Sequence, residues 1–243
     1  MLNIDDFTTS TQIGQGAFGK VYRAYSSNTD YPTTVVIKQI DKLKMMKERM
    51  EIYREIRILK KIDYEYIVKF FGFYEDNAML FQVLEYLPNG NLYSLGKIPE
   101  LEALKYVQDI AHALNYLHFN FIMHRDVKPE NVVLDVNNKA KLIDFGFAQK
   151  FELDKKYKKV LGSLYHIAPE MYLQNYDCRV DIWMLGIMYY ELVSGKVPFN
   201  GENHEDLRCK VLNDSVRYPK YLEDITVQNI EKILVKDLSL IHI

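Results

Sequence analysis

A glycine-rich segment near the start of the chain has the residue types and spacing to bind phosphate. Gly14-Gln15-Gly16-Ala17-Phe18-Gly19 fits the pattern G-x-G-x-x-G. Because glycine has no Cβ, backbone amides in such a segment can approach a phosphate group closely. The pattern alone fits an ordinary glycine-rich turn equally well, and dinucleotide binding would require a helix after it. The next residues, Lys20-Val21-Tyr22-Arg23-Ala24, instead predict a strand, so we expect a loop that joins two strands and covers phosphates from above.

Four further motifs follow along the chain. They are His124-Arg125-Asp126-Val127-Lys128-Pro129-Glu130-Asn131, Asp144-Phe145-Gly146, Ala168-Pro169-Glu170, and Asp181-Ile182-Trp183 with Gly186. An isolated Asp-x-Lys or Asp-Phe-Gly is more often a cap or a turn. In this order and spacing, however, the motifs resemble the signature set of the eukaryotic protein kinases, over residues 7–237. The resemblance implies an α+β bilobal fold, with a small β-rich N-lobe that has one main helix and a larger α-helical C-lobe.

The resemblance also implies roles for residues in the motifs at 124–131 and 144–146. Phosphoryl transfer depends on positioning and charge neutralisation more than on covalent help from the protein. Asp126 would accept the proton of the substrate hydroxyl or orient that hydroxyl, and Lys128 would steady the transferring phosphoryl group. Asn131 and Asp144 would hold Mg²⁺, a hard cation that prefers oxygen ligands.

Two charged residues of the first ninety complete the expected phosphate chemistry. Lys38 lies in the β-branched run Val35-Val36-Ile37-Lys38 and would bind the α- and β-phosphates of ATP. Glu55, on a predicted helix, would be its ion-pair partner. A lone lysine or glutamate at such a place is usually an exposed charge, and the family pattern favours the functional interpretation.

The resemblance implies a nucleotide site for ATP. The residues it places there are Ile13, Gly14, Gln15, Gly16, Ala17, Phe18, Gly19, Lys20, Val21, Val36, Lys38, Leu84, Glu85, Leu87, Asn91 and Val133. Those that would sandwich the adenine are Ile13, Val21, Val36 and Val133. Leu84 would be the gatekeeper, and the backbones of Glu85 and Leu87 would bond the adenine edge. Core packing is the plainer interpretation of each apolar member.

Substrate class follows from the catalytic motif. In the family, lysine at position 128 with Pro129-Glu130 accompanies Ser/Thr specificity, and Ser163 fits a hydroxyl that bonds the catalytic aspartate. We therefore expect protein substrates with Ser/Thr acceptors. The chain resembles both the Aurora-type and the calcium/calmodulin-dependent-type branches. A spine of Leu59, Phe70, His124 and Phe145 is also implied, which makes His124 structural rather than catalytic.

Hydrophobic periodicity indicates the elements that position these residues. Strands are expected over 11–13, 21–25, 35–38, 67–74 and 79–85, and a helix over 43–61. After a break at Pro88-Asn89-Gly90, a helix opens at Pro99-Glu100, and a second helix at 180–193 is apolar all round and therefore buried. We expect an N-lobe over 1–87 and a C-lobe over 88–243. The segment 90–103 is shorter than is typical of the family, so its helix must be abbreviated.

Composition limits the remaining classes. The chain has 243 residues, 48% hydrophobic and 26% charged, with a formal net charge of −2. These values argue against a disordered chain, a coiled coil or a global attraction to nucleic acid. Cys178 and Cys209 are too far apart for a metal motif, and no apolar segment reaches membrane-span length. With no leader pattern at the start, we expect an intracellular protein, cytoplasmic or nuclear, with no nucleic-acid partner and no membrane span.

Three functions are compatible with these motifs. The favoured one is an active Ser/Thr kinase, the second a pseudokinase that acts as a nucleotide-sensing or scaffolding module, and the third a dinucleotide-binding protein. The presence of Lys38, Asp126 and Asp144 favours the first over the second. The strand predicted after Gly19 opposes the third.

Activation is expected to differ from the common pattern. Kinases of this kind often pair the arginine before the catalytic aspartate, here Arg125, with a phosphorylated residue. Residues 147–162 contain no Ser or Thr, and their only hydroxyl is Tyr157 among four lysines. We therefore expect no activating phospho-Ser/Thr there, and expect Glu152, Asp154 or an activating partner protein to dock on Arg125.

The end of the chain departs from the family pattern. Residues 233–237 resemble a late kinase segment that normally continues to an arginine, the partner of the glutamate in Ala-Pro-Glu. No arginine follows Arg217, so Glu170 is expected to lack its usual partner. The last six residues, Leu238-Ser239-Leu240-Ile241-His242-Ile243, are interpreted either as a divergent tail or as a non-native product of sequencing-library preparation. The second is favoured, which leaves the C-lobe incomplete.

Overall fold

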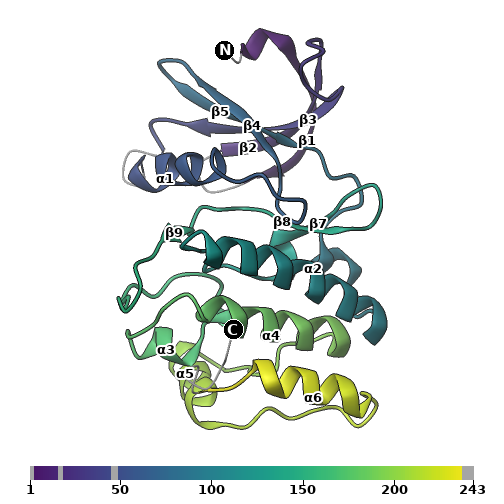
Figure 1. The fold of residues 1–243 in the computed structure, drawn as a ribbon, viewed down its shortest axis with the longest axis vertical. Coiled ribbons are helices and arrows are strands. Elements are labelled where there is room, and N and C mark those ends of the chain that lie inside the picture. The colour runs from purple at the N-terminus through teal and green to yellow at the C-terminus, as the bar shows by residue number, and fades with distance from the viewer. Residues whose placement is uncertain (1–2, 16–18, 45–48, 237–243) are drawn as a thin grey trace. The chain divides into compact units, whose positions relative to one another are not determined.

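The chain divides into two compact units, Met1–Pro88 and Asn89–Ile243. The structure, a computed structural model, describes residues 3–15, 19–44 and 49–236 (Figure 1). The first unit is a sheet with one α-helix, and the second is mainly helical. This composition is the expected α+β class.

A five-stranded antiparallel sheet forms the first unit. Its strands are β1 (Phe7–Gln15), β2 (Gly19–Ser26), β3 (Thr34–Asp41), β4 (Phe70–Glu75) and β5 (Met79–Glu85). The order across the sheet is β1-β2-β3-β5-β4. A 3-10 turn, η1 (Ile4–Asp6), precedes β1, and the helix α1 (Arg49–Leu59) follows β3.

The two faces of this sheet have different neighbours. Side chains alternate between the faces of a strand, and directly paired residues share a face. One face buries Ala24, Val35 and Val83 in a common cluster. The other packs Ile40 and Leu80 against Ile52 and Ile56 of α1. Since Lys38 and Ile40 are two residues apart on β3, Lys38 lies on the face that α1 covers.

Gln82 is a buried amide on the same face. It pairs with Lys38 across β3 and β5, its exposed fraction is 0%, and neither its Nε2 nor its Oε1 has a hydrogen-bond partner in the described part of the chain. An amide buried without partners costs about 1–3 kcal/mol. We therefore expect Gln82→Leu, which has a similar volume, to raise the free energy of unfolding by about that amount.

Denaturant unfolding measures this change as a higher midpoint with an unchanged slope. Gln12→Leu is the control, because Gln12 is exposed on β1. Its effect should stay within about 0.5 kcal/mol, the usual range for surface substitutions. A lower midpoint for Gln82→Leu would show that the amide has a stabilising partner.

Three long helices and two short hairpins build the second unit. α2 (Glu100–Phe119), α4 (Val180–Ser194) and α6 (Asp224–Ile233) are layered, and Figure 1 shows α4 between the other two. The remaining helices are α3 (Pro169–Tyr172), α5 (His204–Asn213) and the 3-10 turns η2 (Leu92–Leu95), η3 (Pro129–Asn131) and η4 (Leu164–His166). The hairpins pair β6 (Ile122–Met123) with β9 (Gln149–Lys150), and β7 (Val132–Leu134) with β8 (Ala140–Leu142).

The helices agree with their hydrophobic patterns, with one difference in length. α4 is buried on all sides, as expected, with Trp183 and Met188 fully inaccessible. The helix expected over 43–61 is α1, which the structure has at Arg49–Leu59, while residues 45–48 lie outside the described part. Between Gly90 and Ala103 the structure has one 3-10 turn, η2, and the start of α2, so the abbreviated helix is confirmed. No helix among the described residues is long and apolar enough to cross a membrane.

Candidate active site

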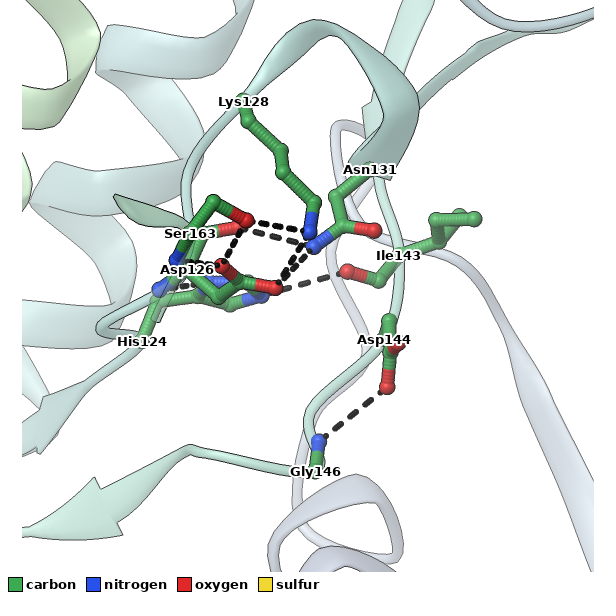
Figure 2. Close-up of polar contacts among 8 residues, drawn as sticks. All are labelled: His124, Asp126, Lys128, Asn131, Ile143, Asp144, Gly146 and Ser163. Atoms are coloured by element: carbon green, nitrogen blue, oxygen red, sulfur yellow. Dashed lines mark hydrogen bonds and ion pairs between the residues drawn. The ribbon is translucent and has the colours of Figure 1, made fainter. Parts of the chain in front are cut away.

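Asp126 lies at the centre of a polar cluster in the loop between β6 and β7. Its side chain is 5% exposed, and both carboxylate oxygens accept hydrogen bonds (Figure 2). Oδ1 accepts from the backbone N–H and from the hydroxyl of Ser163, each at 3.0 Å. Oδ2 accepts from Asn131 Nδ2 at 2.7 Å and lies 3.0 Å from Lys128 Nζ. These contacts fix the orientation of the carboxylate.

Lys128 joins the loop to Ser163, which precedes η4. Its Nζ donates to Ser163 Oγ at 2.6 Å while it contacts Asp126. The three side chains expected to act together therefore form a closed triangle of contacts, although Ser163 is 37 residues from Asp126 in the sequence. The Lys128 side chain is 20% exposed and so remains partly accessible to a ligand.

Asn131 and Asp144 offer oxygen atoms suited to Mg²⁺. The Asn131 amide nitrogen donates to the backbone carbonyl and to Oδ2 of Asp126, at 2.8 and 2.7 Å. Figure 2 shows that the amide oxygen of Asn131 points away from Asp126. Asp144 follows β8, and one of its oxygens accepts from Gly146 N–H at 3.3 Å. One amide oxygen and one carboxylate fit Mg²⁺, which usually binds to few protein groups together with phosphates and water.

No group of three or more His, Cys, Asp or Glu side chains in the described residues forms a metal cluster. Asp144 also has a φ of 59°, in the left-handed region. Such backbone conformations are uncommon outside glycine and concentrate at functional loops.

The predicted ion pair of the first unit is formed. Lys38 Nζ on β3 lies 2.9 Å from Glu55 Oε1 on α1. The Glu55 side chain is 5% exposed, whereas that of Lys38 is 29% exposed. A buried carboxylate that holds a partly accessible ammonium is suited to presenting the ammonium to an anionic ligand.

The glycine-rich motif joins two strands rather than a strand and a helix. β1 and β2 pair Gly14 with Val21 and Gln15 with Lys20, and Ile13 lies beside them on β1. Gly16, Ala17 and Phe18, which were expected at the nucleotide, lie outside the described residues. A Cβ at Gly19 would lie 1.7 Å from the Gln39 carbonyl oxygen, so only glycine fits there. Dinucleotide binding of this type is excluded, because it requires a helix after the glycine motif and a strand follows here.

The other expected nucleotide residues fall in both units. In the first unit, Val36 and Leu84 pair across β3 and β5, the Glu85 N–H donates to the Lys69 carbonyl at 2.9 Å, and Leu87 follows β5. In the second, Asn91 and Val133 form an isolated β-bridge. Asn91 Oδ1 accepts from Ser94 N–H at 3.0 Å and so caps η2.

Comparison with known proteins agrees with this geometry. The model of the protein kinase domain matches residues 7–242. The chain belongs to the protein kinase family. Its relatives include an Aurora kinase and calcium-dependent protein kinases, and the resemblance to the kinase family and the bilobal fold class are confirmed.

Three relatives illustrate the match. Calcium-dependent protein kinase 5 of Plasmodium falciparum is 40% identical over 207 residues, which cover 82% of this chain and 36% of the relative. Calcium-dependent protein kinase 4 of the same organism is 37% identical over 209 residues, covering 82% and 39%. The Aurora kinase of Saccharomyces cerevisiae is 30% identical over 241 residues, covering 97% and 66%. The chain thus spans less than two thirds of the length of these relatives.

His124 of this kinase domain has a supporting place, as the resemblance implied. Its Nδ1 accepts from the Asp126 N–H at 3.3 Å, and its Nε2 contacts the Ile143 carbonyl at 3.2 Å. Its ring lies edge-on to Phe145, with centroids 4.9 Å apart. The histidine therefore connects the loop of Asp126 to the segment that carries Asp144. Leu59 and Phe70, the other expected spine residues, belong to the first unit.

Asp181 is a residue whose contribution the sequence did not indicate. It is fully buried at the start of α4. Its Oδ1 accepts from the Arg125 N–H at 2.6 Å, and its Oδ2 accepts from the His124 N–H and contacts His118 Nε2, both at 2.8 Å. The motif marked Asp181 as a family residue. An acid beginning an otherwise apolar helix was the available signal that it has buried partners.

The groups around Asp181 lower its pKa by more than burial raises it. Burial alone raises the pKa of this carboxyl, but the His118 hydrogen bond, the charges of His118 and His124, and the backbone bond from His124 hold the pKa below its ordinary value. The anionic form is therefore the stable one. It anchors the backbone of the catalytic loop one residue before Asp126.

One expectation for charged residues of the kinase domain needs correction. Neither Glu152 nor Asp154 docks on Arg125, because the Arg125 guanidinium bonds the Phe147 carbonyl and the Tyr176 hydroxyl. Glu152 instead pairs with Lys155, three residues on and at the surface, at 2.6 Å.

Glu170 was expected to lack its usual arginine. In the structure its charge acts on Arg179, whose pKa is raised first by the hydrogen bond to Asp177 and in smaller part by Glu170. A cation from the loop before α4 therefore neighbours this carboxylate.

Proposed function

We propose that this kinase domain transfers the γ-phosphate of ATP, with Mg²⁺, to Ser and Thr hydroxyls of protein substrates. The observation that supports it best is the triangle of Asp126, Lys128 and Ser163, with contacts of 2.6–3.0 Å. In the family, lysine with Pro129-Glu130 at this place accompanies Ser/Thr specificity. The pseudokinase alternative has no observation in its favour among the described residues.

Each side chain contributes by position and charge. Asp126 would take the proton of the acceptor hydroxyl, and Lys128 would balance the charge that develops on the transferred phosphoryl oxygens. Lys38, held by Glu55, would bind the α- and β-phosphates. Mg²⁺ at Asn131 and Asp144 would neutralise charge on the β- and γ-phosphates. We also infer that 1–87 is the N-lobe and 88–243 the C-lobe of this catalytic unit.

Phosphate incorporation into a peptide library tests the proposal. The library should present Ser, Thr and Tyr acceptors in matched sequences, with Mg-ATP and with EDTA as a parallel arm. We expect incorporation at Ser and Thr that EDTA abolishes. Incorporation confined to Tyr, or none at all, would contradict the proposal.

The residues around position 91 predict a modest preference for basic residues upstream of the acceptor. In basophilic kinases an acid at this position helps to bind an upstream arginine, and here Asn91 is neutral, which leaves the exposed Glu130 as the main nearby acid. An exposed ion pair contributes about 0–1 kcal/mol, so replacing an upstream Arg by Ala should slow phosphorylation by no more than about fivefold. Rates across a peptide array measure this.

Asn91→Asp is the matched variant. Aspartate keeps the side-chain oxygen that caps η2 and adds a negative charge. The dependence on upstream Arg should increase in this variant. An array in which the wild-type protein requires one upstream Arg absolutely would refute the prediction.

A further inference from the structure

The guanidinium of Arg125 is buried and bound by neutral oxygens. Arg125 is 2% exposed, and its Nε and Nη2 donate to the Phe147 carbonyl at 2.9 and 2.7 Å. Its Nη1 donates to the Tyr176 hydroxyl at 3.2 Å. No carboxylate among the described residues lies within ion-pair distance of this guanidinium. A buried cation must be hydrogen-bonded to be tolerated, and here these two oxygens supply the bonds.

Tyr176 reaches this position from outside residues 147–162. It is 1% exposed and lies in the loop between α3 and α4. Its hydroxyl accepts from Arg125 and donates to the Lys159 carbonyl at 2.7 Å. Its backbone pairs with Tyr157, with N···O distances of 2.8 and 3.2 Å. One hydroxyl therefore links the catalytic loop to residues 147–162.

Both ends of the segment 147–162 lie close to Arg125. Phe147, at the start, supplies the carbonyl described above. Gly162, at the other end, has a φ of 94°, and a Cβ there would lie 2.6 Å from the Arg125 carbonyl oxygen. Arg125 itself has a φ of 68°, and its backbone N–H is held by Asp181. The residue before Asp126 is thus fixed from several directions.

We propose that the Tyr176 hydroxyl takes the place of an activation-loop phosphate in this kinase. Tyr176 is a positioning residue: through Arg125 it holds Asp126 and residues 147–162 in their working arrangement without phosphorylation. The segment offers no Ser or Thr to modify, and its lysines at 155 and 156 are paired with Glu152 and Asp177. This inference rests on the proposed kinase activity.

Tyr176→Phe tests the inference because it removes one oxygen and keeps the ring. Tyr157→Phe is the matched control: Tyr157 is the bridge partner of Tyr176, and its hydroxyl contacts the Glu152 N–H rather than Arg125. All proteins are treated with phosphatase, and mass spectrometry checks that no phosphate remains. Stripped wild-type protein and Tyr157→Phe should be fully active. Tyr176→Phe should lose about tenfold in kcat with KM for ATP unchanged, the scale of one hydrogen bond to a charged group.

A double-mutant cycle with Arg125→Met separates positioning from general damage. If Tyr176 acts through Arg125, Tyr176→Phe has no further effect on kcat in the Arg125→Met background. Wild-type kcat in stripped Tyr176→Phe, or a stripped wild-type protein that regains activity only on phosphorylation, would overturn the inference.

Trypsin cleavage after the lysines of residues 155–159 provides a readout that does not need catalysis. Tyr176→Phe should be cleaved faster than wild-type protein, because the Lys159 carbonyl loses its donor. If wild-type protein proves inactive on every peptide, the proposed function fails, and cleavage still decides whether Tyr176 holds residues 147–162 in place. Equal cleavage rates would then overturn the inference.

Discussion

Asp126→Asn is expected to reduce turnover by about two orders of magnitude or more, the scale of general-base catalysis. The change is nearly isosteric, but the amide cannot accept the proton of the acceptor hydroxyl. The new N–H₂ group would also face other hydrogen-bond donors, because the contacts of the Asp126 carboxylate come from Ser163, Lys128 and Asn131. ATP affinity should remain nearly unchanged, because Asp126 is assigned to the acceptor hydroxyl rather than to the nucleotide.

Steady-state kinetics on a Ser peptide and calorimetric titration with Mg-ATP measure the two effects separately. Asp154→Asn is the control, since it makes the same chemical change at an exposed position of the second unit. It should leave both values unchanged. Turnover near that of the wild-type protein in Asp126→Asn would remove the assigned role, and a parallel loss of ATP affinity would place Asp126 at the nucleotide instead.

The contacts of the catalytic loop were predictable because a few motifs carry them. Residues 124–131 are close in sequence, so a short loop brings Lys128 and Asn131 to Asp126 with little choice of geometry. Ser163 is distant, and only the family resemblance placed it there. The Lys38–Glu55 pair likewise followed from the family resemblance, while periodicity indicated only the strand and the helix that carry the two residues.

The partners of Arg125 could not be found in the same way. The counter-charge of Arg125 was expected within residues 147–162. One of the two oxygens that bind Arg125 is a backbone carbonyl, which has no sequence signature, and the other belongs to Tyr176, outside that segment. Glu152 was a reasonable candidate by charge. An exposed carboxylate three residues from a lysine pairs with that lysine at the surface, because this pairing does not carry the cost of burying a charge.

Burial patterns predicted where elements pack but not which polar atoms they enclose. β5 occupies the expected 79–85, yet nothing in its alternation indicated that Gln82 would be enclosed without partners. In α4 the apolar pattern predicted a central helix, and it is one. The acid at its first turn was a signal of buried partners, but the pattern did not indicate that these partners are two backbone N–H groups of another loop.

Asp181→Asn is expected to lower the free energy of unfolding by about 3 kcal/mol, the lower end of the range for breaking a buried charged contact. Asparagine keeps the size of the side chain, but its N–H₂ group cannot accept from His118 or from the N–H groups of His124 and Arg125. Asp63→Asn is the control, because the Asp63 side chain is 84% exposed and its 3.9 Å ion pair with Lys69 is screened by water, so stability should barely change.

The pH dependence of the Asp181 effect has a definite sign. The pKa of Asp181 is lower in the folded protein than in the unfolded chain, so its contribution to stability is complete above the unfolded value, about 4, and is lost as the pH falls toward the folded value. The difference between wild-type protein and Asp181→Asn should therefore be constant from about pH 5 upward and shrink below about pH 4. Denaturant midpoints from pH 3 to pH 7 measure it. A difference that grows as the pH falls would mean that the neutral carboxyl, rather than the anion, is the form that holds the catalytic loop.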